Sequence, residues 1–341
     1  MRVADRTTAR NYLKYLNKAK NDLAKTTDRI ASGKRFTSIS EDVSAGTKVL
    51  RSRMDLYKSQ KQLDNVESIN DELTTTESTL MTINDIIGEV HSTKIVKAMS
   101  ENTGEAGRLA IANEISALKD QVLSLANTKY GKKYIFGGTN ASYKEPFTLD
   151  NDGKLLYNGI DVSAIQKKSD GSYFYTDGGE EKPIPMDSVV YTDIGLGIKM
   201  DGNDMNPNTG FKVSYSGLDI LGFGVDADGN SNNIYTVLSD LEASLRNYDK
   251  DKLGSYDTKL VNLTDSYRAS ITDIGAKTSF LDIMKTRLEN DVDGYKTRID
   301  RLMGTDDAEE ATNQTMNDYV LKAVLQMGAN ILPRSLMDYI S

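Results

Sequence analysis

Residues 260–303 read LVNLTDSYRASITDIGAKTSFLDIMKTRLENDVDGYKTRIDRLM, and this stretch decides the fold of the chain. An apolar or aromatic residue returns at every seventh position, at Leu260, Tyr267, Ile274, Leu281, Leu288, Tyr295 and Leu302. A seven-residue apolar repeat is typical of helices that wind around partner helices. The repeat predicts one helix over residues 255–303, far longer than the mean globular helix of about 11–12 residues.

A second pattern of the same kind lies nearer the N-terminus. Apolar spacing alternates between three and four residues at Val66, Ile69, Leu73, Thr76, Leu80, Ile83, Ile87 and Val90. Further helices are predicted over residues 10–31, 105–129 and 233–248, where one face of each is apolar. Because the N-terminal and C-terminal patterns match, the simplest arrangement pairs them as antiparallel helices.

The middle of the chain has a different composition. Residues 131–233 hold 16 of the 26 glycines and 4 of the 5 prolines, which argues against long helices there. Short β-prone runs such as residues 172–176 and 211–215 alternate with turn signals such as Asn158-Gly159. The sequence therefore predicts a mostly α-helical protein with a small β domain inserted at mid-chain, built as an elongated antiparallel coiled-coil rod.

The two ends of the chain carry apolar stripes that little else in the chain would cover. A stripe this narrow does not stabilise an isolated helix in water, so we expect these ends to be disordered before assembly and helical afterwards. The predicted organisation has terminal helices at residues 1–45 and 305–341, a helical rod at 46–130 and 234–304, and the insert at 131–233. The candidate assembly residues are Leu13, Leu16, Leu23, Ile30, Met316, Val320, Val324, Met327 and Ile331.

Composition narrows the function classes. The net charge is −8 and no cluster of Lys and Arg is present, which disfavours nucleic-acid binding. No stretch reaches the roughly 20 apolar residues of a membrane helix, and residues 1–13 have no apolar run of signal-peptide length. The absence of cysteine excludes disulfides and thiolate chemistry. We therefore expect a protein that is either cytosolic or exported without a cleaved signal.

Candidate catalytic and metal-binding residues are few. His91 is the one histidine, and no nucleophile accompanies it in the sequence, so a surface or interface role is expected. The run Asp226-Ala227-Asp228-Gly229-Asn230 resembles the start of a calcium loop, but Ser231 and Val237 stand where an EF-hand has Gly and Glu. Acidic pairs at residues 306–310 are read as partners of a helix dipole. The sequence thus predicts no enzyme activity, no cofactor and no metal site.

Two motifs near the N-terminus carry a family resemblance. The run RIASGKR at residues 29–35 is followed by Glu41-Asp42 and Ala45-Gly46, and it resembles the N-terminal signature of the flagellin family. The run DAEEAT at residues 307–312 is similar to the matching C-terminal segment. In many members Pro or Ala follows the acidic pair, whereas this chain has Val43-Ser44. The signature residues are Ser32, Gly33, Lys34, Arg35 and Asp42.

Other motifs favour one branch of that family. YIFGGTN at residues 134–140, with Phe136, Gly137 and Gly138 at its centre, resembles the hook-associated protein 3 branch. EPF at 145–147, YNG at 157–159 and the ending SLMDYI at 335–340 are similar to that branch too.

The resemblance implies a structural subunit that forms a layer at the hook–filament junction. Its partners would be copies of itself, the other junction protein, flagellin and an export chaperone, with no nucleic acid and no membrane insertion. It would be extracellular, exported by the flagellar type III apparatus without a cleaved signal peptide. The alternative within the family is flagellin itself. A surface adhesin or an enzyme carried by the insert, and a cytosolic coiled-coil scaffold, are alternatives from other classes.

Overall fold

The chain forms two compact units, residues 1–60 with 289–341 and residues 61–288. A computed structural model describes residues 2–139, 144–169, 171–185, 187, 190–197, 199–201, 204–205, 210–213 and 215–331. The first unit joins two segments that lie far apart in the sequence, whereas the second is one continuous segment. The helices α2 (Val43–Glu89) and α7 (Lys250–Met303) contribute residues to both units.

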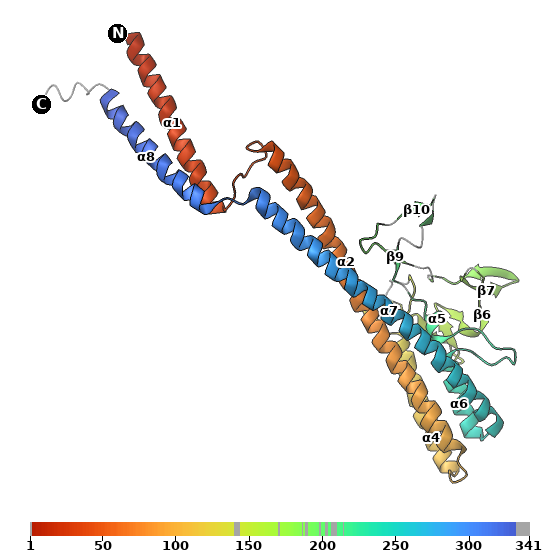
Figure 1. Cartoon of the computed structure of the whole chain (residues 1–341). Helices are drawn as coiled ribbons and strands as arrows, with labels where there is room; N and C mark the ends of the chain where they lie inside the picture. The colour runs from red at the N-terminus through yellow and green to blue at the C-terminus, as the bar shows by residue number, and fades with distance from the viewer. Residues whose placement is uncertain are drawn as a thin grey trace. The chain divides into compact units, whose positions relative to one another are not determined.

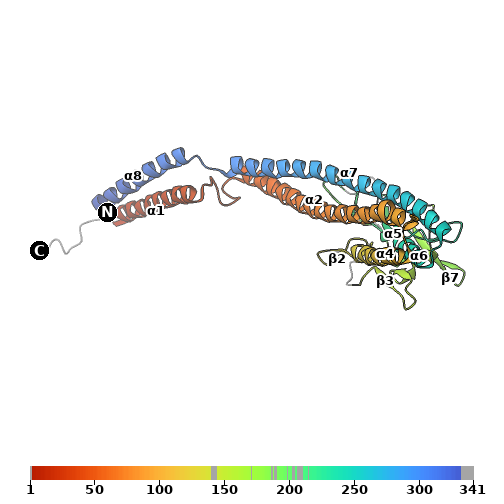
Figure 2. The same cartoon turned by 90° about the horizontal axis from the view of Figure 1, so that it is seen from below.

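The first unit contains the pair formed by α1 (Arg2–Ser32) and α8 (Asp307–Ile331). The two helices lie side by side and antiparallel in both views (Figures 1 and 2). The helix predicted over residues 10–31 begins earlier, because residues 2–9 contain no proline or glycine that would stop it. It ends where predicted, before Gly33, whose φ of 63° a right-handed helix cannot contain.

The helices α2 and α7 also run antiparallel and side by side (Figure 2). The Lys285 ammonium lies 3.0 Å from a Glu67 carboxylate oxygen, and Asn70 donates to Asp282 over 3.3 Å. The predicted heptad positions face each other, and Leu73, Leu80, Leu260, Ile274 and Leu281 are completely buried. Full burial of such a side chain contributes about 1.5–3 kcal/mol, so this seam is a main source of stability in the second unit.

After α2 the chain forms a π-helical turn at Val90–Ile95, then α3 (Val96–Met99) and α4 (Glu105–Ala126). The helix α6 (Ile234–Asn247) packs against α4, and Lys119 on α4 lies 2.9 Å from Glu242 on α6. The predicted helix over residues 105–129 ends early because Asn127 pairs with the insert. Its amide donates to the Phe147 carbonyl over 2.8 Å and accepts from the Phe147 N–H over 3.1 Å.

In the described part of the insert, the β domain contains short antiparallel strands, a 3-10 helical turn at Val162–Ala164 and the short helix α5 (Gly217–Leu221). Two three-stranded sheets have the orders β3-β4-β5 and β6-β7-β8, and three strand pairs accompany them. The strands are β1 (Lys129–Tyr130), β2 (Lys133–Tyr134), β3 (Phe147–Leu149), β4 (Leu155–Tyr157), β5 (Ile160–Asp161), β6 (Ile165–Lys167), β7 (Tyr173–Asp177), β8 (Glu180–Pro183), β9 (Tyr191–Thr192), β10 (Met200–Asp201), β11 (Asp204–Met205) and β12 (Phe211–Lys212). The predicted turn at Asn158-Gly159 joins β4 to β5, with φ of 50° and 90° at its two residues.

Side chains of the β domain and of the helices share one continuous hydrophobic core in the second unit. Its largest fully buried members include Phe136, Phe147, Tyr157, Tyr267 and Leu73. The prediction of a mostly helical chain with antiparallel helix pairs and a mid-chain β domain is thus confirmed.

Candidate assembly surface

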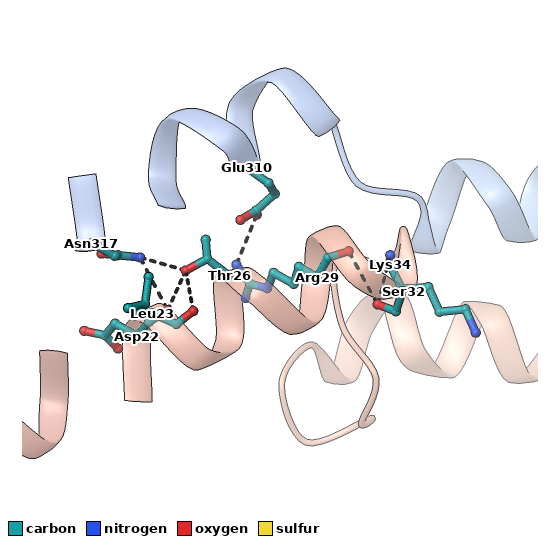
Figure 3. A network of polar contacts seen from close by, with 8 residues as sticks. All are labelled: Asp22, Leu23, Thr26, Arg29, Ser32, Lys34, Glu310 and Asn317. Carbon is teal, nitrogen blue, oxygen red and sulfur yellow. Dashed lines mark hydrogen bonds and ion pairs between the residues drawn. The ribbon is translucent and has the colours of Figure 1, made fainter. Parts of the chain in front are cut away.

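The contact between α1 and α8 is held in register by polar side chains (Figure 3). A guanidinium nitrogen of Arg29 lies 3.3 Å from Oε1 of Glu310. The Asn317 amide donates to Thr26 Oγ1 over 2.9 Å, and that hydroxyl donates to the Asp22 carbonyl over 2.6 Å. Because each of these bonds needs a particular partner, they fix how far one helix is shifted along the other.

The face that α1 turns toward α8 is made of small and polar residues. Ala19 and Thr26, seven residues apart, are 6% and 4% exposed. On α8 the facing residues Glu310, Asn317 and Val324 keep the same seven-residue spacing. Sequence reasoning missed this seam because it followed the larger apolar side chains. The signal was the heptad spacing itself, which persists where the residues are small or polar.

The predicted assembly residues lie largely outside that seam. Leu13 is 54% exposed, Met316 58%, Val320 43% and Met327 59%. Leu16, Leu23, Ile30 and Val324 are half-buried, and Ile331 is the last residue of α8. Tyr15, Tyr319 and Leu325 add further exposed apolar area to the same two helices. The pair therefore leaves much of its apolar surface uncovered.

A hollow of about 550 Å³ opens between the two helices. Its lining includes Tyr12, Tyr15, Val320, Val324 and Met327. A Cβ atom added at Gly328 on α8 would overlap the Tyr12 ring, so glycine is required for the ring to lie where it does. Apolar side chains around an open hollow suit the side chains of another helix.

The signature residues 32–35 join the end of α1 to the break between α7 and α8. Ser32 Oγ accepts from the Lys34 N–H over 3.3 Å, and Lys34 forms an antiparallel bridge with Gly304. The Arg35 N–H donates to the Met303 carbonyl over 2.7 Å, and the Thr305 N–H donates to the Gly33 carbonyl over 3.2 Å. The motif is thus a backbone clamp between the two ends of the chain.

Asp42 starts the helix that follows the signature. Its Oδ1 accepts from the Ala45 N–H over 2.9 Å, which satisfies a free donor at the start of α2. Its Oδ2 lies 3.2 Å from the Arg35 guanidinium in an exposed ion pair, which contributes at most about 1 kcal/mol. Phe36 between them is 5% exposed and packs in a small core with Val49 and Met303.

The second motif, Phe136-Gly137-Gly138, anchors the β domain. The Phe136 ring is completely buried, and its carbonyl accepts from the Gly217 N–H over 3.0 Å and from the Tyr157 hydroxyl over 3.2 Å. Gly137 forms an antiparallel bridge with Ser216, and Gly138 has a φ of 61°. These residues therefore position backbone and core, and none presents a reactive group.

Several titratable groups with a shifted pKa lie in the β domain. Asp187 accepts from the Tyr157 hydroxyl over 2.9 Å and from the Ser216 hydroxyl over 3.1 Å, and burial raises the pKa of its carboxyl. Tyr173 donates to Asp219, and burial raises the pKa of that tyrosine. Both pairs are hydrogen-bonded acids with no histidine beside them. His91 lies elsewhere, with Nδ1 2.6 Å from Oδ1 of Asp257.

In the loop that resembles a calcium site, the positive charge is supplied by a lysine side chain of the protein itself. The Lys259 ammonium on α7 lies 2.7 Å from Asp226 Oδ2 and donates to the Asn230 carbonyl over 3.1 Å. This ammonium holds the pKa of the Asp226 carboxyl below its usual range. Across the described residues, no three His, Asp or Glu side chains are placed to hold a metal ion. None of the helices within the described ranges combines the length and hydrophobicity needed to cross a bilayer.

We expect a chelator to leave the thermal unfolding of this protein unchanged, because the Lys259 ammonium already lies between the oxygens of the Asp226 loop. Melting followed by circular dichroism with calcium and with EDTA measures this. The Lys259→Met variant should melt at a lower temperature, whereas Lys252→Met, which loses an exposed pair with Asp249, should not. A calcium-dependent rise in the wild-type melting temperature would contradict the assignment.

Comparison with known proteins agrees with the sequence motifs. Residues 3–141 match the model of the bacterial flagellin N-terminal helical region. No curated protein matches the chain at a significant level.

Among solved structures, the fold is similar to that of a candidate flagellar hook-associated protein from Vibrio parahaemolyticus. The identity is 13%, the match covers 77% of this chain and 99% of that chain, and the TM-score is 0.58. It is also similar to that of FlgL from Xanthomonas campestris, with 16% identity, coverage of 72% and 98%, and a TM-score of 0.50. At identities of 13% and 16%, these matches show that the fold is similar and carry no information about a shared role.

Proposed function

We propose that the protein is a structural subunit of the bacterial flagellum, because residues 3–141 match the model of the bacterial flagellin N-terminal helical region. It forms a short layer between hook and filament. Many copies of one chain have to pack side by side in such a layer, and the terminal helices supply the packing surface.

The observation that carries this proposal is the uncovered apolar face of the α1–α8 pair. Leu13, Met316 and Met327 are each more than half exposed, although they belong to two helices that already pack on each other. Exposed apolar area of this extent on a helix pair is typical of a surface that other helices cover. Small and polar residues form the contact between the two helices. The large apolar residues therefore remain exposed and can pack against neighbouring copies.

The junction role is favoured over the filament role by the insert. The Phe136-Gly137-Gly138 motif, which resembles hook-associated proteins, lies at the contact between β domain and helices. The fold is shared with two proteins described as hook-associated or FlgL. The ending at residues 335–340, the other motif that resembles this branch, lies outside the described residues.

The partners we propose are further copies of the chain, the other junction protein and flagellin. Before assembly, a flagellar export chaperone holds the C-terminal helix, and the chain leaves the cell through the flagellar type III channel. We infer no catalytic role, because the perturbed acids of the β domain are engaged in hydrogen bonds within the fold.

We propose that residues 1–45 and 305–341 order only on assembly, whereas the helices of 46–130 and 234–304 and the insert at 131–233 are folded beforehand. The polar seam of α1 and α8 buries little apolar area, which supports this. In the purified monomer, amide exchange over residues 1–40 and 305–341 should be fast, and that of α4 slow. Protected amides at both ends would instead favour a preformed coiled-coil scaffold.

The test of the function is electron microscopy of the purified protein, alone in precipitant salt and with isolated hooks that carry the first junction protein. A short added layer on hooks, with no filaments from the protein alone, is the expected result. Long filaments from the protein alone would make it a flagellin, and no assembly under either condition would contradict both assignments.

A further inference from the structure

The first half of α2, which belongs to the first unit, carries two heptad repeats on different faces of the helix. The buried repeat consists of Ala45, Val49, Ser52 and Ser59, and Val49 packs with Met303 of α7. The exposed repeat consists of Val43, Leu50, Met54 and Tyr57, which we call the α2 stripe. The two repeats are offset by two residues, or about 200° of helix rotation, so the stripe lies almost opposite α7.

This face of α2 is apolar only in the first half of the helix. The positions that continue the same three-four spacing to the end of α2 are all polar, namely Lys61, Asp64, Ser68, Asp71, Thr75, Ser78, Thr82, Asp85 and Glu89. Side chains of a helix face that stays in water are expected to be polar, as these are. The change in character after Tyr57 therefore indicates that the first half of this face is covered in the assembled protein.

A hollow of about 340 Å³ lies beside the α2 stripe. Leu50 belongs to both the stripe and the lining of the hollow, and Ile39, from the loop before α2, is equally exposed at 45%. The buried side chains of Val49 and Met303 also line it. Where heptad helices pack, a large side chain of one helix inserts into a hole between residues of the other. The hollow therefore suits an apolar side chain of a partner helix.

The residues that border the α2 stripe are mostly basic. Residues 43–60 contain Lys48, Arg51, Arg53 and Lys58 against the single acid Asp55. Arg51 and Lys58 directly follow stripe residues, and charges beside a heptad seam determine which partner helix it accepts. Two copies of the stripe packed on each other would bring like charges together, so the partner surface has to be a different one.

The first half of α8 combines acidic residues with exposed apolar area. Residues 307–319 contain four acidic residues and no lysine or arginine. Met316 and Tyr319, one helical turn apart, are 58% and 73% exposed. The helix α1, by contrast, has eight basic and three acidic residues and would repel the stripe, and the second half of α2 is acidic but polar on its exposed face. Of these three surfaces, α8 matches the stripe in both charge and hydrophobicity.

We propose that the α2 stripe of one copy packs against α8 of the next copy, at the face that carries Met316 and Tyr319. This inference rests on the proposed function, since it needs copies that pack side by side. The two surfaces differ, so the contact is heterologous and repeats from copy to copy around a closed layer. The assembly surface then extends from the terminal helices into α2.

Replacement of Met54 by glutamate tests whether the stripe is covered. Met54 is 72% exposed, so the new carboxylate stays in water in the free chain but is buried among apolar side chains in the contact. Hooks that carry the first junction protein are incubated with the full-length variant and sedimented, and the protein added per hook is measured. The added amount should fall by about tenfold or more, with unchanged thermal melting. The matched control, Met81→Glu in the second half of α2, should add normally.

Crosslinking identifies the surface that covers the stripe. The chain contains no cysteine, so a short bismaleimide joins two copies only through cysteines that are introduced. On sedimented hooks, a mixture of Met54→Cys and Met316→Cys copies should give a crosslinked dimer, and neither variant alone should. The double variant should give a ladder of longer oligomers, because each copy then carries both sides of a repeating contact. The control mixture of Met81→Cys and Met316→Cys should give no crosslink.

The outcomes separate this inference from the proposed function. If wild-type protein does not add to hooks, the proposed function fails, and the inference that rests on it fails too. If wild type adds and Met54→Glu adds equally well, the stripe is not covered, and the inference is wrong while the function stands. The inference is also wrong if Met54→Cys copies crosslink to each other, which would mean that two stripes meet. If the mixture gives no crosslink, another protein covers the stripe, and α8 is not its partner.

Discussion

Replacement of Val324 by aspartate is expected to abolish the addition of this protein to hooks. Val324 is half-buried in the hollow between α1 and α8, among the apolar side chains that we assign to neighbouring copies. A carboxylate in that place would be buried without a partner in the assembled layer, at a cost on the order of several kcal/mol. Cells that carry the variant should be non-motile, and electron microscopy of hooks should show no added layer.

The matched control for this variant is Val261→Asp on α7. Val261 is 39% exposed and belongs to the second unit, where the new charge can remain in water. Both variants should keep the wild-type melting of the second unit, since neither position lies in its core. Normal motility of the Val324→Asp strain would show that the hollow between α1 and α8 is not a contact surface between copies.

The second large effect is expected from Phe136→Ala, which should destabilise the second unit by about 3–5 kcal/mol. The ring is completely buried in the core that joins the β domain to the helices. Truncation removes its apolar contacts and leaves a cavity between them. In a unit of this size the melting temperature should fall by roughly 6–20 °C, as measured by circular dichroism.

Phe280→Ala is the control for that measurement. Phe280 is 39% exposed and stacks on Phe211 at 6.2 Å, so its truncation should cost roughly 1–2 kcal/mol. Equal melting temperatures for Phe136→Ala and wild type would show that the motif does not anchor the β domain. The aromatic-Gly-Gly motif would then need an explanation other than stability.

The sequence was informative wherever the relevant pattern is local. The resemblance stated from residues 29–35 is confirmed by the flagellin match over residues 3–141. The turn at Asn158-Gly159 and the helix start at Asn233, whose side chain accepts from the Tyr235 N–H over 2.9 Å, lie where turn and capping chemistry predict them. The assembly residues and the three-part domain organisation remain predictions.

Three features required the tertiary structure. Residues 306–310 are predicted to be dipole partners, and they lie at the start of α8, where Asp306 accepts from the Ala308 N–H over 3.0 Å. Only the structure shows that Glu310 also packs against Arg29. The sequence assigns no metal site to the loop at Asp226, and only the structure shows that this loop binds Lys259 from α7. The leucine stripe of α1 is predicted to serve assembly, and only the structure shows that Ala19 and Thr26 are the residues that face α8.

The sequence by itself determined that this chain forms long heptad helices around a glycine-rich β domain, because period and turn chemistry depend only on neighbours along the chain. The tertiary structure alone decided which face of each helix is covered and which remains free. Arg29 and Glu310 are 281 residues apart, and their contact depends on how two whole segments fit in shape and charge. No local pattern records that fit, so the surface offered to neighbouring copies becomes visible only once the chain is folded.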